Sequence, residues 1–335
     1  MIYRRSLTII VKKWNSMKNN FYQKIGITLT LLTISLSVLS QEIKLTHIMG
    51  NMEIKEQPER VVILGLGPLD AADALHVNPI AISKMVIFPH YLTQYDSSQY
   101  PSVGTIFEPD FEAIYNQKPG LIIIGPRSTK HYNELKKIAP TYVFSVPNDV
   151  EYWEGTQEIW RDLGRIFNKE DLVDKKIKAY SQRFLAITRN NQRHNMDAMM
   201  IMSSGENISS FGQNSRFAVI YQDLGFIPTL KNSLHKPKQI GGHGNLVSYE
   251  LITQVNPSTL LIMDRDKLVN SGTSTTHQKI ENNLIKSTKA YKNQRVVYLN
   301  ITAWYVASSG ITATDIMLQD IEALSTPHRE KTSEN

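Results

Sequence analysis

The chain has 335 residues, of which 41% are hydrophobic, so it is long enough to form two domains with buried cores. Its formal net charge is +6, but residues 1–40 contain six basic residues and no acidic residue, so the rest of the chain is neutral. This balance argues against a general nucleic-acid-binding surface. The sequence contains no cysteine, which excludes disulfide bonds and a lipid anchor attached to cysteine.

The first expected element is a secretory signal peptide at residues 1–40. Basic residues precede an apolar stretch at residues 25–39, and Ser40 is small enough for a signal-peptidase subsite before Gln41. The apolar stretch is shorter than the roughly 20 residues of a membrane-spanning helix, so we expect cleavage and a soluble exported protein. Met17 would begin a more ordinary signal peptide than Met1 and is an alternative start.

Residues 41–150 alternate short apolar strands with helices. Strands are expected at residues 60–65, 121–124 and 142–146, and helices at residues 68–75, 110–117 and 130–138. This alternation favours an N-terminal α/β lobe with a mainly parallel sheet.

Residues 151–193 form a predicted helical link. Its apolar residues recur at spacings of four and three, which places them on one face of a long helix: Val173, Ile177, Tyr180, Phe184 and Ile187. The other face is charged. One long helix would make a stiff connector between two lobes.

Residues 194–325 repeat the α/β pattern and predict a C-terminal lobe, followed by a polar tail at residues 326–335. Strands are expected at residues 198–203, 259–263 and 295–299, and helices at residues 215–224, 248–255, 276–290 and 311–324.

A helix, a strand and an arginine recur in both halves at an offset of 138 residues. Glu112 and Arg127 in the first half correspond to Glu250 and Arg265 in the second half. Each glutamate lies seven residues before a proline, and each arginine lies eight residues after that proline. This repetition favours two lobes related by pseudo-symmetry.

Common enzymatic motifs are missing. Gly65-Leu-Gly67-Pro68 follows a strand and opens a helix, but a dinucleotide site would need a third glycine and the amide that Pro68 lacks. A tight turn is therefore the better interpretation. The sequence has no phosphate-binding loop, no zinc-ligand spacing among its nine histidines, and no nucleophile elbow.

Several residues nevertheless suggest a binding site. His243 stands in the glycine-rich segment Gly241-Gly-His243-Gly244, and Trp304-Tyr305 follows a predicted strand. An incidental turn and ordinary aromatic packing remain alternatives for these two features. Three arginines also lie at the ends of predicted elements, which favours a recess for anions: Arg127, Arg216 and Arg265.

Five stretches resemble a known family, and they occur in its order along the chain. They are Pro101-Ser-Val-Gly104, Pro109-Asp-Phe-Glu-Ala-Ile114, Ser209-Ser-Phe-Gly-Gln-Asn-Ser-Arg-Phe217, Gly241-Gly-His-Gly244 and Trp304-Tyr-Val-Ala-Ser308. From about residue 60 to residue 324 the sequence resembles the periplasmic siderophore-binding proteins of the FecB/BtuF superfamily, most closely the enterochelin-uptake type. It departs from tethered relatives in lacking a cysteine for lipid attachment, so the resemblance supports ligand binding but not tethering.

The resemblance implies a class III periplasmic binding protein. Two Rossmann-like α/β lobes would be joined by a single long helix, with the ligand cleft between them. The protein would be the periplasmic component of an ABC importer and would deliver an anionic Fe(III)–catecholate siderophore to an inner-membrane permease. The siderophore would be of the enterobactin type or one of its linear tetradentate fragments. We expect a monomer that is not an enzyme, has no intrinsic cofactor and binds iron only as the siderophore complex.

The resemblance also assigns roles to residues. His243 and Tyr305 match direct iron ligands. The anionic catecholate oxygens would be contacted by Arg127, Arg216 and Arg265. Glu112 and Glu250 match glutamates that engage arginines of the importer, although acidic residues near helix starts also simply complement the helix dipole.

This assignment makes chemical sense. Iron(III) favours anionic oxygen and accepts imidazole, and a phenol loses its proton more readily beside such a charge. A tetradentate bis-catecholate leaves two of the six positions on iron open, which one histidine and one tyrosine would fill. Haem or cobalamin is an alternative ligand, since tyrosine can bind haem iron, but three arginines exceed what two propionates require. A periplasmic siderophore esterase is a second alternative, without a motif to support it.

Overall fold

The computed structural model describes residues 42–85, 87–230, 244–269 and 280–325. The expected signal peptide at residues 1–40 and the polar tail at residues 326–335 lie outside this part of the chain. The described residues group into one compact unit. Within the described segments, no helix has both the length and the apolar character needed to cross a membrane.

The first half forms a five-stranded parallel sheet. Its strands are β3 (Val61–Leu64), β4 (Ala81–Lys84), β5 (Ser102–Thr105), β6 (Leu121–Ile124) and β7 (Thr141–Val143), in the spatial order β5-β4-β3-β6-β7. Every residue of β3 and β6 is buried, as expected for a parallel sheet that is covered on both faces. This strand order is that of a Rossmann-like half, so the predicted α/β class is confirmed.

The second half forms a mixed sheet. Its strands are β8 (Asp197–Ser204), β9 (Asn207–Phe211), β10 (Ile227–Pro228), β11 (Asn245–Leu246), β12 (Leu260–Asp264) and β13 (Val296–Tyr298). Strands β8, β12 and β13 are parallel, whereas β9 runs antiparallel to β8 and β11 antiparallel to β9. The antiparallel strands arise because a two-residue turn, in which Gly205 has a φ of 60°, joins β8 directly to β9.

A hairpin outside both sheets precedes the first lobe. It consists of β1 (Ile43–His47) and β2 (Gly50–Ile54). The ring of His47 packs edge-on against Tyr132 and Tyr142, and its Nε2 lies 3.2 Å from the carbonyl oxygen of Thr141. The hairpin is thus attached to the edge of the first sheet that carries β7.

Two helices, rather than one, occupy the predicted link. Helix α5 (Tyr152–Phe167) ends at Asn168, which has a φ of 54°, and the 24-residue helix α6 (Glu170–Arg193) follows. Four of the five residues on the predicted apolar face of α6 are buried, and Tyr180 is half-buried. The predicted amphipathic helix is therefore confirmed.

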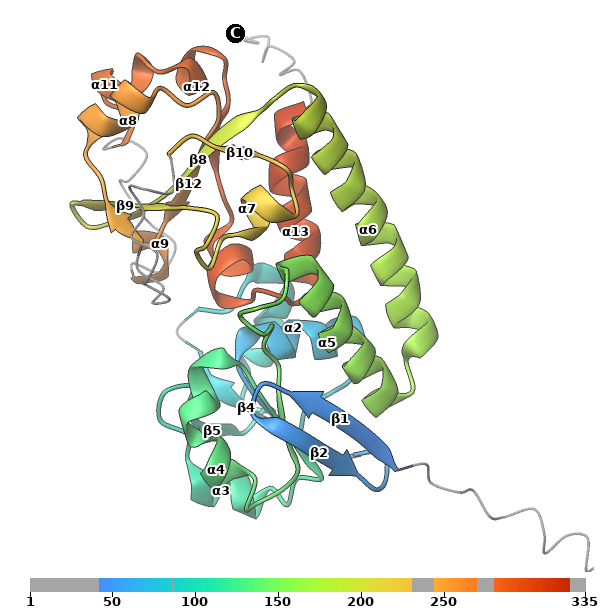
Figure 1. Ribbon diagram of the computed structural model, residues 1–335. Helices are drawn as coiled ribbons and strands as arrows, with labels where there is room; N and C mark the ends of the chain where they lie inside the picture. Colours follow the sequence, from blue (N-terminus) through green and yellow to red (C-terminus); the bar gives the residue numbers. More distant parts are fainter. Residues whose placement is uncertain (1–41, 86, 231–243, 270–279, 326–335) are drawn as a thin grey trace, which may run out of the picture. The chain divides into compact units, whose positions relative to one another are not determined.

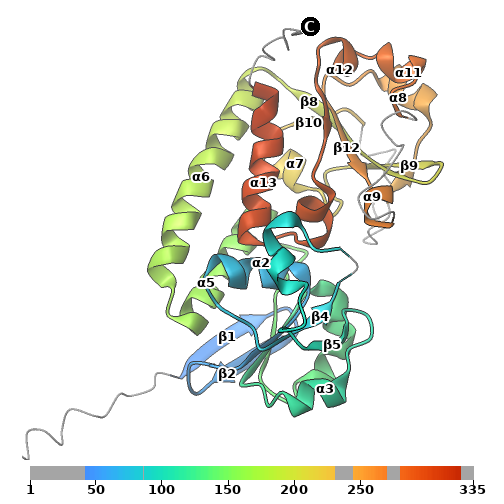
Figure 2. The ribbon, with the colours of Figure 1, turned by 180° about the vertical axis from the view of Figure 1, so that it is seen from behind.

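Helix α13 (Ile311–Glu322) joins the two halves by packing. It contacts both α2 (Leu66–Ala74) and α6, and it runs alongside α6 in both views (Figures 1 and 2). Arg183 of α6 pairs with Asp315 and Glu322 of α13. The largest apolar core accordingly contains residues from both halves, such as Leu69, Trp160, Met200 and Met317. Two smaller clusters cover the other faces of the sheets.

The remaining helices are short. They are η2 (His90–Tyr95), α3 (Phe111–Asn116), η3 (Pro126–His131), α4 (Tyr132–Leu135), α7 (Val219–Gln222), α8 (Tyr249–Val255), α9 (Asp266–Val269), α11 (Asn283–Lys286), α12 (Lys289–Lys292) and η6 (Ala323–Ser325).

Three predicted helices differ from the structure. The helix expected at residues 130–138 is divided between η3 and α4, and the helix expected at residues 215–224 is reduced to α7. The described part of the helix expected at residues 276–290 contains α11 and the start of α12, because new caps interrupt it. The side chain of Asn282 accepts hydrogen bonds from the amides of Leu284 and Ile285 in α11, and that of Thr288 accepts one from Tyr291 in α12.

Candidate ligand-binding site

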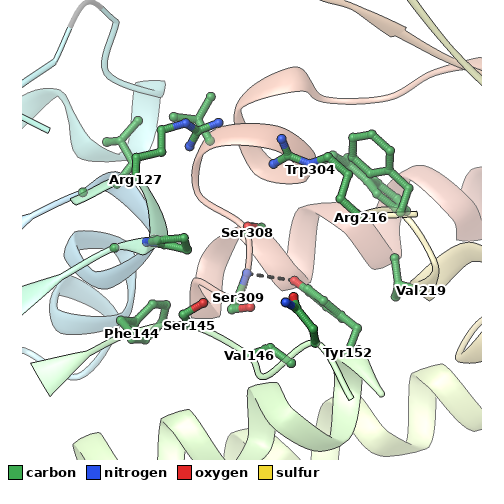
Figure 3. Close-up of a pocket in the computed structure, with 18 of the residues that line it drawn as sticks. Arg127, Phe144, Ser145, Val146, Tyr152, Arg216, Val219, Trp304, Ser308 and Ser309 are labelled. Carbon is green, nitrogen blue, oxygen red and sulfur yellow. Dashed lines mark hydrogen bonds between the residues drawn. The ribbon is translucent and has the colours of Figure 1, made fainter. Parts of the chain in front are cut away.

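A cavity of about 660 Å³ lies beyond the carboxyl ends of the first sheet (Figure 3). Strands β3, β6 and β7 deliver Gly65, residues 125–128 and residues 144–148 to its wall. The strand order reverses between β3 and β6, and ligands of open α/β sheets bind at such a reversal. The second half of the chain supplies residues 213–219 and part of the segment from Trp304 to Ser309.

The glycine motif after β3 allows a close approach of two segments at this cavity. Gly65 has a φ of 134°, a conformation that residues with a Cβ rarely adopt. A Cβ on Gly67 would lie 2.8 Å from the carbonyl oxygen of Ser308. The predicted tight turn is confirmed, and Gly67 has the additional role of letting residues of the second half pack against the start of α2.

Arg127 and Arg216 line the cavity and converge on Tyr305, which is not itself among the lining residues. Their Nη2 atoms lie 3.3 Å and 3.1 Å, respectively, from the carbonyl oxygen of Tyr305. Their guanidinium carbons lie 5.1 Å and 4.2 Å from the centre of its ring, within the range of a cation–π contact. In Figure 3 the two arginines come from different segments of the chain.

The two guanidiniums create an excess of positive charge. Desolvation, together with the nearby charge of Arg127, lowers the pKa of Arg216, although an arginine remains protonated in proteins. No carboxylate within the described ranges forms an ion pair with Arg127 or Arg216. This corner of the cavity is therefore suited to an anion.

Tyr305 belongs to a π-helical turn, η5 (Thr302–Val306), of a kind frequently found at functional sites. Asp320 of α13 holds this turn and the residue two positions before it. Its Oδ2 accepts hydrogen bonds from the backbone amide of Asn300 at 2.8 Å and from the indole of Trp304 at 2.9 Å. Burial raises the pKa of Asp320. Trp304 therefore anchors the turn, whereas Tyr305 is half-buried and lies against the two arginines.

Two further contacts fix the wall of the cavity where the halves meet. Ser309 has a φ of 64°, and its amide donates to the hydroxyl of Tyr152 at 2.8 Å, the bond dashed in Figure 3. The carboxylate of Asp70 is completely buried and accepts hydrogen bonds from the amides of Thr312 at 2.7 Å and Ala313 at 2.9 Å. An α2 side chain thus caps the N-terminus of α13.

Sequence reasoning missed the roles of Asp70 and Tyr152. A usable signal for Asp70 was an acidic residue in the mainly apolar helix α2, whose only other acidic residue is Asp73. Tyr152 begins α5, directly after the segment that follows β7, so the strand-end rule applied to β3 and β6 would also have indicated this region.

The other proposed ligand contacts are placed differently. Arg265 follows β12, is exposed, and donates to the hydroxyl of Ser204 at 3.4 Å. It is not among the residues that line the cavity formed by the described segments. His243 lies outside the described residues. The structure therefore brings Tyr305 together with two of the three arginines.

Glu112 and Glu250 occupy corresponding places in the two halves. Each is the second residue of a helix whose cap accepts a hydrogen bond from the residue after the glutamate: Asp110 caps α3 and Ser248 caps α8. Both glutamates are exposed. Its own backbone amide and the hydroxyl of Ser248 lower the pKa of Glu250, so this side chain is an anion at neutral pH.

Comparison with known proteins identifies the family. Residues 61–301 match the model of the periplasmic binding protein family. The chain belongs to this family. It is similar to the crystal structure of the periplasmic catecholate-siderophore binding protein VctP from Vibrio cholerae, with 47% identity and a TM-score of 0.80 over 84% of this chain and 100% of that chain.

Two curated relatives support the assignment. The petrobactin-binding protein YclQ of Bacillus subtilis is 32% identical over 272 residues, which cover 81% of this chain and 83% of YclQ. The ferric-anguibactin-binding protein FatB of Vibrio anguillarum is 31% identical over 84% of this chain and 87% of FatB. Because these relatives are binding proteins, this periplasmic binding protein is not an enzyme, and the esterase alternative is not supported. The two-lobed α/β fold expected from the sequence is confirmed.

Proposed function

We propose that this periplasmic binding protein carries an anionic Fe(III)–catecholate siderophore to the permease of an ABC importer. The observation that carries the proposal is the convergence on Tyr305 of Arg127 and Arg216, two arginines that line a cavity of about 660 Å³. The 47% identity to a catecholate-siderophore binding protein supports the same ligand class. Enterobactin-type complexes and their linear tetradentate fragments both fit this class.

The arginines supply the counter-charge in this proposal. A ferric catecholate complex carries several negative charges on oxygen, and guanidinium groups bind such oxygens through charge-assisted hydrogen bonds. Arg127 and Arg216 contact the part of the complex within the cavity. Arg265 would contact a part of the ligand that extends beyond the cavity walls described above.

The iron ligands in this proposal are Tyr305 and His243. With a tetradentate bis-catecholate bound, the phenol oxygen and the imidazole take the two open positions on the cargo iron. The coordinated phenol oxygen would carry negative charge, which the neighbouring guanidiniums of Arg127 and Arg216 would balance.

Delivery completes the proposal. Glu112 and Glu250 engage cationic side chains of the inner-membrane permease, one from each lobe. The lobes comprise residues 41–150 and 194–325, with residues 151–193 as the link. The protein acts as a monomer in the periplasm after removal of residues 1–40, without a lipid anchor.

Fluorescence quenching titrations test the ligand class. The mature protein is titrated with ferric complexes of a linear bis-catecholate, a hexadentate tris-catecholate and a hydroxamate siderophore, and with haem. Tight binding of the catecholates with weak binding of the hydroxamate and haem is expected. Preferential binding of haem or of the hydroxamate would contradict the proposal.

A further inference from the structure

Large apolar side chains are exposed beside both glutamates that we propose for docking. Within the part of the chain that the structure describes, eight large hydrophobic side chains are exposed, and four of them lie within five residues of Glu112 or Glu250 in the chain or on α11, which packs against α8. Their exposed fractions are 54% for Phe107, 67% for Tyr115, 73% for Leu246 and 37% for Leu284. Since half of these exposed side chains gather at two small regions, the distribution calls for an explanation.

The first region surrounds Glu112. The hydroxyl of Thr105 accepts a hydrogen bond from the amide of Phe107 at 3.2 Å, and the ring of His131 lies 2.8 Å from the carbonyl oxygen of Phe107. The backbone of Phe107 is thus held while its side chain remains exposed, just before helix α3. Tyr115 lies three residues after Glu112 on α3, so these two side chains are neighbours on the surface of the helix.

The second region surrounds Glu250. Leu246 ends β11, two residues before Ser248, which caps α8. Thr253 lies three residues after Glu250 on α8, and its hydroxyl donates to the carbonyl oxygen of Leu284 at 3.2 Å. Leu284 therefore lies beside the turn of α8 that follows Glu250. Each glutamate thus has one exposed apolar residue before its helix and a second one at or beside the following turn of that helix.

The charge of these regions suits a cationic partner. Residues 105–117 contain three acidic side chains and no basic one, and residues 245–255 contain Glu250 and no basic side chain. An exposed ion pair alone contributes little to binding, because water solvates both charges. Apolar side chains around the pair exclude that water, and interface energy concentrates at such aromatic and arginine contacts.

We propose that each glutamate is the centre of a mixed acidic and apolar contact patch for the permease. The first patch consists of Phe107, Glu112 and Tyr115, and the second patch consists of Leu246, Glu250 and Leu284. The inference rests on the proposed function, and it specifies the partner's chemistry. At two places the permease presents a cationic side chain, with an apolar surface beside it.

Alanine substitutions outside the glutamates test the patches. Phe107→Ala and Leu246→Ala are combined in one variant, and Leu185→Ala and Ile227→Ala are combined in a control, since Leu185 and Ile227 are each 47% exposed elsewhere on the surface. Cells that lack the native copy express each variant and receive radioactive iron as a ferric bis-catecholate. The patch variant is expected to lower uptake about tenfold at limiting binding protein, with ligand affinity unchanged. The control should match the wild type.

A second measurement distinguishes the patches from docking by the glutamates. A photo-crosslinking amino acid placed at position 107 or 246 is expected to attach to the membrane subunit of the importer, and one at position 185 is not. A contrary outcome is that the double variant Glu112→Ala with Glu250→Ala abolishes uptake while the patch variant transports normally and positions 107 and 246 do not crosslink. That outcome would contradict the patches and leave docking by the glutamates in place. If the wild type binds no ferric bis-catecholate, the proposed function itself is contradicted, and the patches with it.

Discussion

Two arginines that line the cavity, neither with a carboxylate partner in the described segments, meet at Tyr305. Arg127 and Arg216 both donate to Tyr305, and in the described segments neither forms an ion pair. Like charges in a partly desolvated site repel each other, so the free protein holds this corner at an electrostatic cost. An anionic ligand removes that cost and gains charge-assisted hydrogen bonds at the same time.

Removing either guanidinium should therefore weaken binding of the ferric bis-catecholate. A charge-assisted hydrogen bond contributes roughly 1.5–3 kcal/mol, so Arg127→Ala and Arg216→Ala are each expected to lower affinity about ten- to a hundredfold. Quenching titrations measure the effect, with Arg189→Ala on the exposed face of α6 as the control. Arg265→Ala should lower the affinity less, because Arg265 is not among the residues that line the cavity. Unchanged affinity in both Arg127→Ala and Arg216→Ala would contradict binding at this corner.

Tyr305→Phe separates coordination of iron from packing. The change removes one oxygen and keeps the ring that contacts the two arginines. It should weaken the tetradentate complex much more than the hexadentate complex, since a hexadentate ligand already fills all six positions on iron. The ligand-to-metal absorption band of the tetradentate complex should shift as well. His243→Ala should show the same selectivity. Equal affinities and an unshifted band in both variants would exclude direct coordination by this pair.

Sequence patterns indicate candidate residues for this site, but they do not show that these residues come together in space. Arg127, Arg216 and Tyr305 were each predicted to lie at the end of an element, where α/β folds bind ligands. Arg127 is 178 residues away from Tyr305 in the chain, and Arg216 is 89 residues away. Their distances depend on how the two halves pack, and no local pattern encodes that packing. The capping role of Asp70 was missed for the same reason, because the amides that donate hydrogen bonds to it are more than 240 residues away in the chain.

At the level of elements, the contact between Asp70 and α13 links the start of the first half to the last helix. Burial raises the pKa of Asp70 to about 7, and hydrogen bonds from Tyr91, Thr312 and Ala313 oppose the rise. The carboxyl of an unfolded aspartate has a pKa of about 3.9. The folded protein therefore binds a proton that the unfolded chain does not bind between about pH 4 and pH 7.

This linkage predicts a pH-dependent stability difference between the wild type and Asp70→Asn. Because the folded state holds the extra proton, the contribution of Asp70 is fully present below about pH 4 and is lost as the pH rises through about 7. The difference in unfolding free energy should fall by at most about 1.4 kcal/mol per pH unit across this range. Urea unfolding of both proteins at pH 5, 6 and 7 measures this difference. The contributions of the other buried acids cancel in it, because both proteins contain those acids. A constant difference would contradict the prediction.

Elements with strong local signals were predicted well. Asp110 and Ser248, the first residues of two predicted helices, each accept a capping hydrogen bond from a backbone amide, and β6 has the predicted bounds because Gly120 and Gly125 flank a run of four apolar residues. The helix expected at residues 276–290 was wrong because side-chain caps compete with helix continuation. The caps at Asn282 and Thr288 start new short helices within its described part.

At the level of the whole molecule, the class of fold followed from the sequence pattern but the arrangement of the strands did not. Alternating strands and helices predicted two α/β lobes, and the family match confirms that fold. The order of the first sheet depends on which strands pair, and residues of one strand carry little information about their partner. The antiparallel β9 was missed because the two-residue turn at Gly205 was not recognised as a hairpin signal.

Transport by the whole molecule requires ligand binding and docking to be separable. Glu112 and Glu250 are exposed and follow side-chain caps at the starts of α3 and α8, whereas the cavity is lined by other residues. Replacing both glutamates with alanine should abolish iron uptake while affinity for the ferric bis-catecholate stays within about tenfold, or roughly 1.4 kcal/mol.

Each single replacement should reduce uptake only in part, because the second lobe retains its contact. The double replacement Glu134→Ala with Glu170→Ala serves as a control, since it also removes one acidic residue from the first turn of each of two helices. Uptake by cells and quenching titrations on the same variants provide the two measurements. Loss of ligand affinity in the Glu112→Ala and Glu250→Ala double variant would assign these residues to the binding site instead. Full uptake by that variant would show that the two glutamates are not needed for docking.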